Sequence, residues 1–264
     1  MTRPVIAYDN KLENFDSATA GGGLTAEIPL AVNWLTYDFL EFGPGETVPV
    51  LEASLRMDFD DEQGPVSILA IIVDQSIVGL DMRVRFSFDG SWADWINIDP
   101  FVQSGPALRE IPEQTGWDRV EFEWTRNNLG DRIRIPMILL GPQMHLERSA
   151  FLNVTPPGFN PSDEYNRNRS ESGQTMGLTL KRLGIQNEIS FDNVSLEWIK
   201  DEWKPFADHM RKKACFWAWD QDDNPLDVAF VERDGNPQAN PTTIGGPNQQ
   251  GYWQVSLPVK GIAE

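Results

Sequence analysis

Alternating apolar and polar residues run through the first half of the chain. A period of two is typical of a β-strand with one buried face. One further segment, residues 66–73, is apolar almost throughout and predicts a strand covered on both faces. Because turn residues separate these segments, we expect residues 1–130 to form a jelly-roll-like β-sandwich module. The alternating segments are residues 52–59, 82–88 and 120–124.

The second half predicts further strands and one helix. Acidic residues at 201–202, Pro205 and three bases at 211–213 indicate a helix over about residues 202–213. Residues 153–177 contain almost nothing suited to a core, so we expect a long exposed loop there. Residues 131–264 would form a second module. Its expected strands are residues 132–135, 215–219 and 252–259.

Charge narrows the range of partners. The 264 residues include 22 Lys and Arg against 40 Asp and Glu, a formal net charge of −18. Nucleic acids and anionic membranes require positive surface, so we expect neither as a partner.

The single cysteine excludes an internal disulfide. The first residues lack the apolar core of a secretory signal, and no apolar run is long enough to span a bilayer, so we expect a protein made in a cytoplasm.

Recognisable catalytic motifs are absent from the sequence. It has no Walker A loop, nucleophile elbow, zincin helix or Rossmann fingerprint. His145 and His209 are the only histidines, and Cys215 lies among aromatic residues, which favours a buried structural thiol. We therefore expect no enzyme, no catalytic residue and no cofactor. A glycoside hydrolase that uses two carboxylates stays open as a rival.

A cluster of acids at residues 220–227 begins like a calcium-binding loop. Asp220, Asp222 and Asn224 stand at alternate positions, but Pro225 replaces the glycine that such loops require. We expect a solvated acidic turn without a metal, with these three residues as the alternative calcium ligands.

Three tryptophans lie among polar residues of the first module. Trp92 and Trp95 follow the turn signal Asp89-Gly90, and Trp117 precedes an alternating segment. Exposed indole rings can stack on sugars, whereas core packing is the commoner use of tryptophan. Both interpretations stay open for each of the three.

Three groups of segments share a pattern with one known class of protein. The first group comprises residues 31–35, 47–50, 67–72 and 82–85, the second residues 183–185, 196–198 and 214–220, and the third residues 251–260. Together they resemble the tail-tip proteins of long-tailed, siphovirus-like bacteriophages, in particular distal tail proteins.

This resemblance implies a structural protein of the virion tail tip. Such a protein would form a homo-oligomeric ring, a trimer or hexamer, that joins the tail tube protein to the hub and receptor-binding proteins. It implies that residues 131–264 form a tail-tube-like split β-barrel with one packed helix, and that residues 153–177 form an arm towards the next subunit. Expected contacts in the ring are Asn160, Tyr165, Arg167 and Arg169. The alternative function is a carbohydrate-binding module of a phage or bacterial surface protein.

Overall fold

The computed structural model describes two compact units in a chain that is mainly β. One unit is Ala7–Gln143, and the other combines Met1–Ile6 with Met144–Glu264. The prediction of a mainly β fold with one helix is confirmed, whereas the domain boundary differs, because residues 131–143 belong to the first unit and the N-terminal strand to the second. The described residues are 4–21, 39–42, 52–125, 131–147, 156–157, 161–162, 164–169, 174–182, 184–242 and 251–262.

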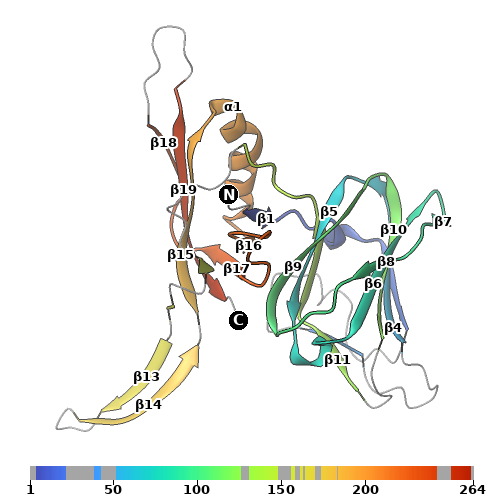
Figure 1. The fold of residues 1–264 in the computed structure, drawn as a ribbon, viewed down its shortest axis with the longest axis horizontal. Coiled ribbons are helices and arrows are strands. Elements are labelled where there is room, and N and C mark those ends of the chain that lie inside the picture. The colour runs from blue at the N-terminus through green and yellow to red at the C-terminus, as the bar shows by residue number, and fades with distance from the viewer. Residues whose placement is uncertain are drawn as a thin grey trace. The chain divides into compact units, whose positions relative to one another are not determined.

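The Ala7–Gln143 unit is a β-sandwich, hereafter the sandwich unit (Figure 1). Its larger sheet has the order β2-β4-β10-β6-β7, with β8 also paired to β6, and its smaller sheet has the order β12-β5-β9. A further pair, β3 and β11, completes it. The larger sheet contains β2 (Ser17–Gly21), β4 (Glu52–Gln63), β6 (Asp81–Phe88), β7 (Ser91–Trp92), β8 (Ile96–Ile98) and β10 (Trp117–Thr125). The other strands are β3 (Leu40–Phe42), β5 (Val66–Val73), β9 (Gly105–Gln114), β11 (Ile133–Ile135) and β12 (Met137–Gly141), and two 3-10 turns, η1 (Lys11–Asn14) and η3 (Gln75–Ile77), lie between strands.

Alternation along the strands sends apolar residues into the sandwich. Leu55 on β4 and Val84 on β6 flank Phe122 of β10, and all three are buried in the core. The continuous apolar strand β5 is buried at every position except Ser67, as the sequence predicts. The polar residues between the apolar ones on β4, β6 and β10 consequently lie on the outer face of the larger sheet.

Asn10 closes the sandwich unit where its two ends meet. Its side-chain amide donates to the Ile138 carbonyl at 3.1 Å and accepts from the Leu140 amide at 3.1 Å. Gly141 lies so close to Asp9 that a Cβ there would stand 2.0 Å from the Asp9 carbonyl oxygen. The segment that enters the unit is therefore fastened to its last strand, β12.

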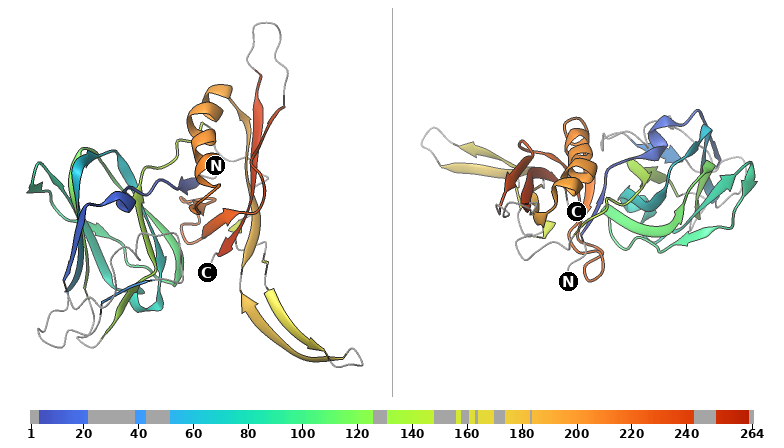
Figure 2. Two further views of the ribbon diagram at one scale, coloured as in Figure 1. Left: turned by 180° about the vertical axis from the view of Figure 1, so that it is seen from behind. Right: turned by 90° about the horizontal axis from the view of Figure 1, so that it is seen from above.

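The other unit, hereafter the terminal unit, contains an open six-stranded sheet. Its order is β1-β16-β17-β19-β15, with β18 paired to β19. The predicted split barrel is not closed, because β1 and β15 lie at opposite ends of this path among the described strands. A separate hairpin of β13 and β14 continues past the end of the sheet (Figures 1 and 2). The strands are β1 (Val5–Ala7), β13 (Glu164–Arg169), β14 (Thr175–Arg182), β15 (Ile185–Val194), β16 (Cys215–Ala218), β17 (Val228–Arg233), β18 (Gln238–Pro241) and β19 (Trp253–Ile262).

The helix of the terminal unit begins and ends earlier in the chain than the sequence predicts. It runs through α1 (Leu196–Trp198), a π-helical turn η5 (Ile199–Trp203) and α2 (Lys204–His209). It begins after Ser195, whose hydroxyl accepts from the Trp198 amide at 3.1 Å. It packs on the sheet through ring contacts of Phe191, on β15, with Trp198 and Trp203. The predicted span of 202–213 is therefore wrong at both ends.

The predicted loop over residues 153–177 is also wrong in part. Residues 164–169 and 175–177 belong to the antiparallel hairpin of β13 and β14. Other parts of the predicted loop, and the resemblance segments 31–35 and 47–50, lie outside the described residues. Among the described residues, no helix is long and apolar enough to cross a membrane.

Candidate functional site

The outer face of the larger sheet carries alternating arginines and acids. In register across the sheet, Glu121 of β10 lies between Arg56 of β4 and Arg85 of β6. One residue pair further along, Glu123 lies opposite Arg83. The Nε of Arg85 donates to Glu121 at 2.7 Å, and the Nε of Arg83 donates to Glu123 at 2.6 Å. Such cross-strand pairs stabilise the sheet and leave both arginines electrostatically satisfied.

Two tryptophans lie on these arginines. Trp92 and Trp95 are both only partly exposed. The guanidinium carbon of Arg85 is 4.6 Å from the ring centroid of Trp92 and 4.3 Å from that of Trp95, so Arg85 contacts both indoles. Arg83 also lies 4.5 Å from the Trp95 centroid, and Arg56 lies 5.4 Å from the Trp92 centroid. These cation–π contacts fix the two indoles as a platform on the outer face.

The turn between β6 and β7 creates this arrangement. Asp89 and Gly90 have φ angles of 49° and 79°, the left-handed pair that a tight two-residue hairpin requires. The turn folds β7 back along β6 and brings Trp92 opposite Ser87. Ser87 is 0% exposed although it lies on the outer side of the strand, and its hydroxyl has no hydrogen-bond partner among the described residues. Burial of an outward residue shows how closely this part of the sheet is covered.

Trp117 does not share this face. It is 0% exposed and packs against Phe59 and Phe86, with ring centroids at 5.1 and 5.4 Å. Its indole nitrogen donates to the Gly64 carbonyl at 3.2 Å. The prediction of a stacking role for Trp117 is therefore wrong, and the core alternative is correct for this residue.

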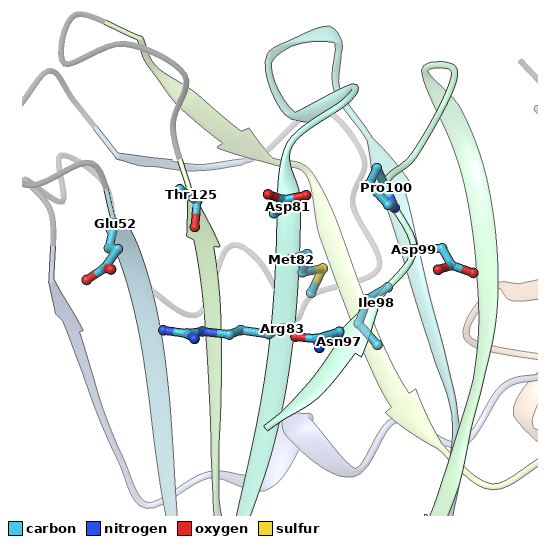
Figure 3. Close-up of a pocket in the computed structure, with 9 residues that line it drawn as sticks. All are labelled: Glu52, Asp81, Met82, Arg83, Asn97, Ile98, Asp99, Pro100 and Thr125. Atoms are coloured by element: carbon cyan, nitrogen blue, oxygen red, sulfur yellow. The ribbon is translucent and has the colours of Figure 1, made fainter. Parts of the chain in front are cut away.

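A pocket of about 430 Å³ adjoins the platform (Figure 3). It lies where β4 begins, β10 ends and β6 begins, and Figure 3 shows the Arg83 side chain extending from β6 across β10. Because Arg83 also contacts the Trp95 ring, the pocket and the tryptophans share one wall. The volume falls in the usual range for small-molecule sites. The lining residues are Glu52, Asp81, Met82, Arg83, Asn97, Ile98, Asp99, Pro100 and Thr125.

One pocket residue interacts with the smaller sheet. Asp99 attracts the Arg109 guanidinium, which stacks on Phe101 with 5.1 Å between its central carbon and the ring centroid. Burial lowers the pKa of Arg109, and the nearby Asp99 carboxylate opposes this shift. Arg109 therefore holds the loop after β8 and partly offsets the charge of Asp99.

The predicted calcium residues lie apart from this face, in the terminal unit. Asp220 is 3% exposed and accepts from the Asn224 side chain at 3.3 Å, while the Asn224 amide donates to the Asp220 carbonyl at 3.0 Å. Asp227 accepts from the indole of Trp219 at 3.1 Å. Throughout the described segments, no three His, Cys, Asp or Glu side chains are placed to hold a metal ion. These hydrogen bonds give Asp220 and Asn224 a role in shaping the turn.

The histidines and the cysteine have structural surroundings. A ring nitrogen of His209 lies 2.9 Å from the Ala214 carbonyl oxygen, which ties the helix end to the next strand. His145 is exposed, and its carbonyl accepts from the Trp198 indole at 2.7 Å. Cys215 is fully buried, and burial raises the pKa of its thiol, so the reactive thiolate is disfavoured.

The expected ring contacts are placed only in part. Tyr165, Arg167 and Arg169 lie on β13, opposite Leu180, Leu178 and Thr175 of β14, whereas Asn160 lies outside the described residues. Their role in assembly stays a prediction.

Several residues of the candidate site were missed by sequence reasoning. The alternating segments were interpreted by their apolar positions, which form the core. The arginines and acids between those positions form the outer face of the sheet. The pocket residues Asp81, Asn97 and Asp99 come together only through the pairing of β6 with β8. A search for strands whose polar positions alternate in charge would find Arg83 and Arg85.

Comparisons with known proteins find structural likeness alone. No family model and no curated protein matches the chain. A solved chitosan-binding module from a Paenibacillus chitosanase/glucanase matches with 14% identity and a TM-score of 0.40, over 50% of this chain and 98% of that one. The lectin domain of lectinolysin, complexed with Lewis B antigen, matches with 7% identity and a TM-score of 0.41, over 52% and 98%. A carbohydrate-binding module from Clostridium perfringens, in complex with GalNAc-β-1,3-galactose, matches with 9% identity and a TM-score of 0.37, over 47% and 94%. No family assignment follows from likenesses at this level.

Proposed function

We propose that the sandwich unit is a non-catalytic carbohydrate-recognition module. The observation that carries the proposal is the pair Trp92 and Trp95, fixed by Arg85 on an outer sheet face beside a polar pocket. A flat, partly exposed indole offers an apolar surface to the C–H face of a sugar ring. The amide and carboxylate groups of Asn97 and Asp81 supply hydrogen-bond partners for its hydroxyls.

Glycan-array binding by the full chain tests this function. We expect binding to at least one glycan class, with a dissociation constant that rises about tenfold in Trp95→Ala, which corresponds to the loss of about 1.4 kcal/mol from one stacking contact. Tyr252→Ala is the matched control, because Tyr252 is an exposed aromatic residue (43%) of the terminal unit. Equal melting temperatures would show that both variants fold. Absence of any glycan binding, or binding that Trp95→Ala leaves unchanged, would refute the proposal.

A second function, self-assembly of the tail-tip type, is favoured by one observation on the terminal unit. The β13–β14 hairpin forms its own two-stranded sheet, apart from the six-stranded sheet. Isolated two-stranded hairpins are marginally stable in water, so partner contacts would stabilise this one. This role would place β13 against a neighbouring copy, in a ring that docks to tube and hub proteins of a virion.

Light scattering across a range of concentrations tests assembly. We expect a trimer or hexamer for the full chain and a monomer when residues 164–182 are replaced by a short Gly-Ser linker. Circular dichroism of the helix serves as the folding control. A full chain that stays monomeric at every concentration, with and without its hairpin, would contradict self-assembly.

A further inference from the structure

Negative side chains outnumber positive ones around the pocket. Three carboxylates line it, from Glu52, Asp81 and Asp99, against one arginine, Arg83. Arg83 is already held by Glu123, whose side chain is only 11% exposed, and by the face of Trp95. It is therefore engaged twice and is a poor partner for a ligand anion.

Within the part of the chain that the structure describes, two of the carboxylates have no compensating partner. Asp99 is partly offset by Arg109, as described above. Glu52 and Asp81 have no ion pair or hydrogen bond to any of the described residues, and both are exposed, at the start of β4 and of β6, the two strands that flank β10. Figure 3 shows both carboxylates at the same end of the sheet, on either side of Thr125. The pocket mouth therefore has negative charge that a ligand can neutralise.

The sandwich unit as a whole is also negatively charged. Residues 7–143 contain 23 acidic and 9 basic residues, a net charge of −14. Such a field repels uronic acids and sulfated or sialylated glycans and attracts cations.

We propose that the pocket selects a glycan with a protonated amine, that is, an amino sugar without an N-acetyl group. This inference rests on the proposed carbohydrate binding and specifies its ligand. One sugar ring stacks on Trp95, and the ammonium group of the same or the next ring lies between the carboxylates of Glu52 and Asp81. Acetylation removes this charge and adds a methyl group that the carboxylates cannot bind.

A pair of matched ligands tests the inference by isothermal titration calorimetry with the full chain. The ligands are a β-1,4-linked glucosamine oligosaccharide and its fully N-acetylated counterpart, at a pH at which the free amine is protonated. We expect the glucosamine form to bind at least tenfold more tightly, and its affinity to fall as NaCl rises from about 50 to 500 mM. In the double variant Glu52→Gln, Asp81→Asn, the preference should disappear. Asp61→Asn is the matched control, because Asp61 is an exposed acid near the other end of β4.

The outcomes separate the inference from the function on which it rests. Binding of neutral or N-acetylated glycans without preference for the amine would overturn the inference and leave carbohydrate binding standing. The same holds for a preference that survives in the double variant. Failure to bind these ligands and a broad glycan panel would overturn both.

Discussion

Arg85 connects the structural and the proposed functional roles of the outer face. Its guanidinium pairs with Glu121 and contacts the rings of both Trp92 and Trp95. An arginine that donates to a carboxylate and also contacts aromatic rings uses both the hydrogen bonding and the ring contacts of a planar cation. The indoles consequently have fixed positions without entering the core.

Arg85→Ala is expected to destabilise the sandwich unit by about 1–3 kcal/mol. The variant loses two cation–π contacts and leaves Glu121, whose side chain is 17% exposed, without its partner. Urea unfolding measures this change, and a red shift of tryptophan emission would report freer indoles. The control is Arg211→Ala, because Arg211 forms an exposed pair with Asp208, and we expect a change below about 0.5 kcal/mol. Equal stability of the two variants would contradict a fixed platform.

The sequence predicts the surface tryptophans but does not separate them from Trp117. On β10, Val120, Phe122 and Trp124 point inward, so simple alternation would turn Trp117 outward. A register shift between Trp117 and Arg119 reverses this orientation. Bulges of this kind depend on how two strands pair, which the pattern of one strand does not encode.

At the scale of elements, the start of the helix could not be predicted from the sequence, because its buried residues do not follow the spacing of a regular α-helix. Trp198 and Trp203 are five residues apart, yet both are buried. The π-helical turn makes this possible, since the Lys204 amide donates to the Ile199 carbonyl five residues earlier. The following Pro205 has no amide hydrogen to donate, so a helical pattern of 3.6 residues per turn breaks at this place. The sequence signals of acids, proline and bases therefore located only the second part of the helix.

Ser195→Ala is expected to destabilise the terminal unit by about 1 kcal/mol. The Ser195 hydroxyl accepts from the Trp198 amide at 3.1 Å and satisfies a free donor of the first turn. Near-ultraviolet circular dichroism during urea unfolding follows the aromatic cluster of Trp198, Trp203 and Phe191. Ser195→Thr keeps the hydroxyl and should restore most of the loss. If alanine and threonine variants unfold alike, the hydroxyl does not cap the helix.

At the scale of the whole chain, the sandwich unit is an insertion. Strand β1 joins β16 in the sheet of the terminal unit, and the chain then forms the entire sandwich before returning at Met144. The Met144 amide donates to the Ile6 carbonyl at 3.1 Å, so the chain leaves and re-enters the terminal unit at neighbouring points. The sequence predicts the two parts through their strand patterns, but a three-residue strand carries too little pattern to reveal that its partner lies near the other end of the chain.

This topology predicts that the terminal unit depends on β1 for its stability. Residues 144–264 alone lack β1, which leaves β16, buried at all four positions, as an exposed sheet edge. We expect this fragment to melt at a clearly lower temperature than a variant in which residues 1–6 are joined to residues 144–264 by a short Gly-Ser linker. Residues 7–143 alone should fold, because Asn10 already fastens both ends of the sandwich unit. Calorimetry of the full chain should then show two transitions, which match those of the sandwich fragment and the linked variant. If the fragment with and without β1 melts at the same temperature, the N-terminal strand does not stabilise the sheet, and the sandwich unit is a simple N-terminal domain.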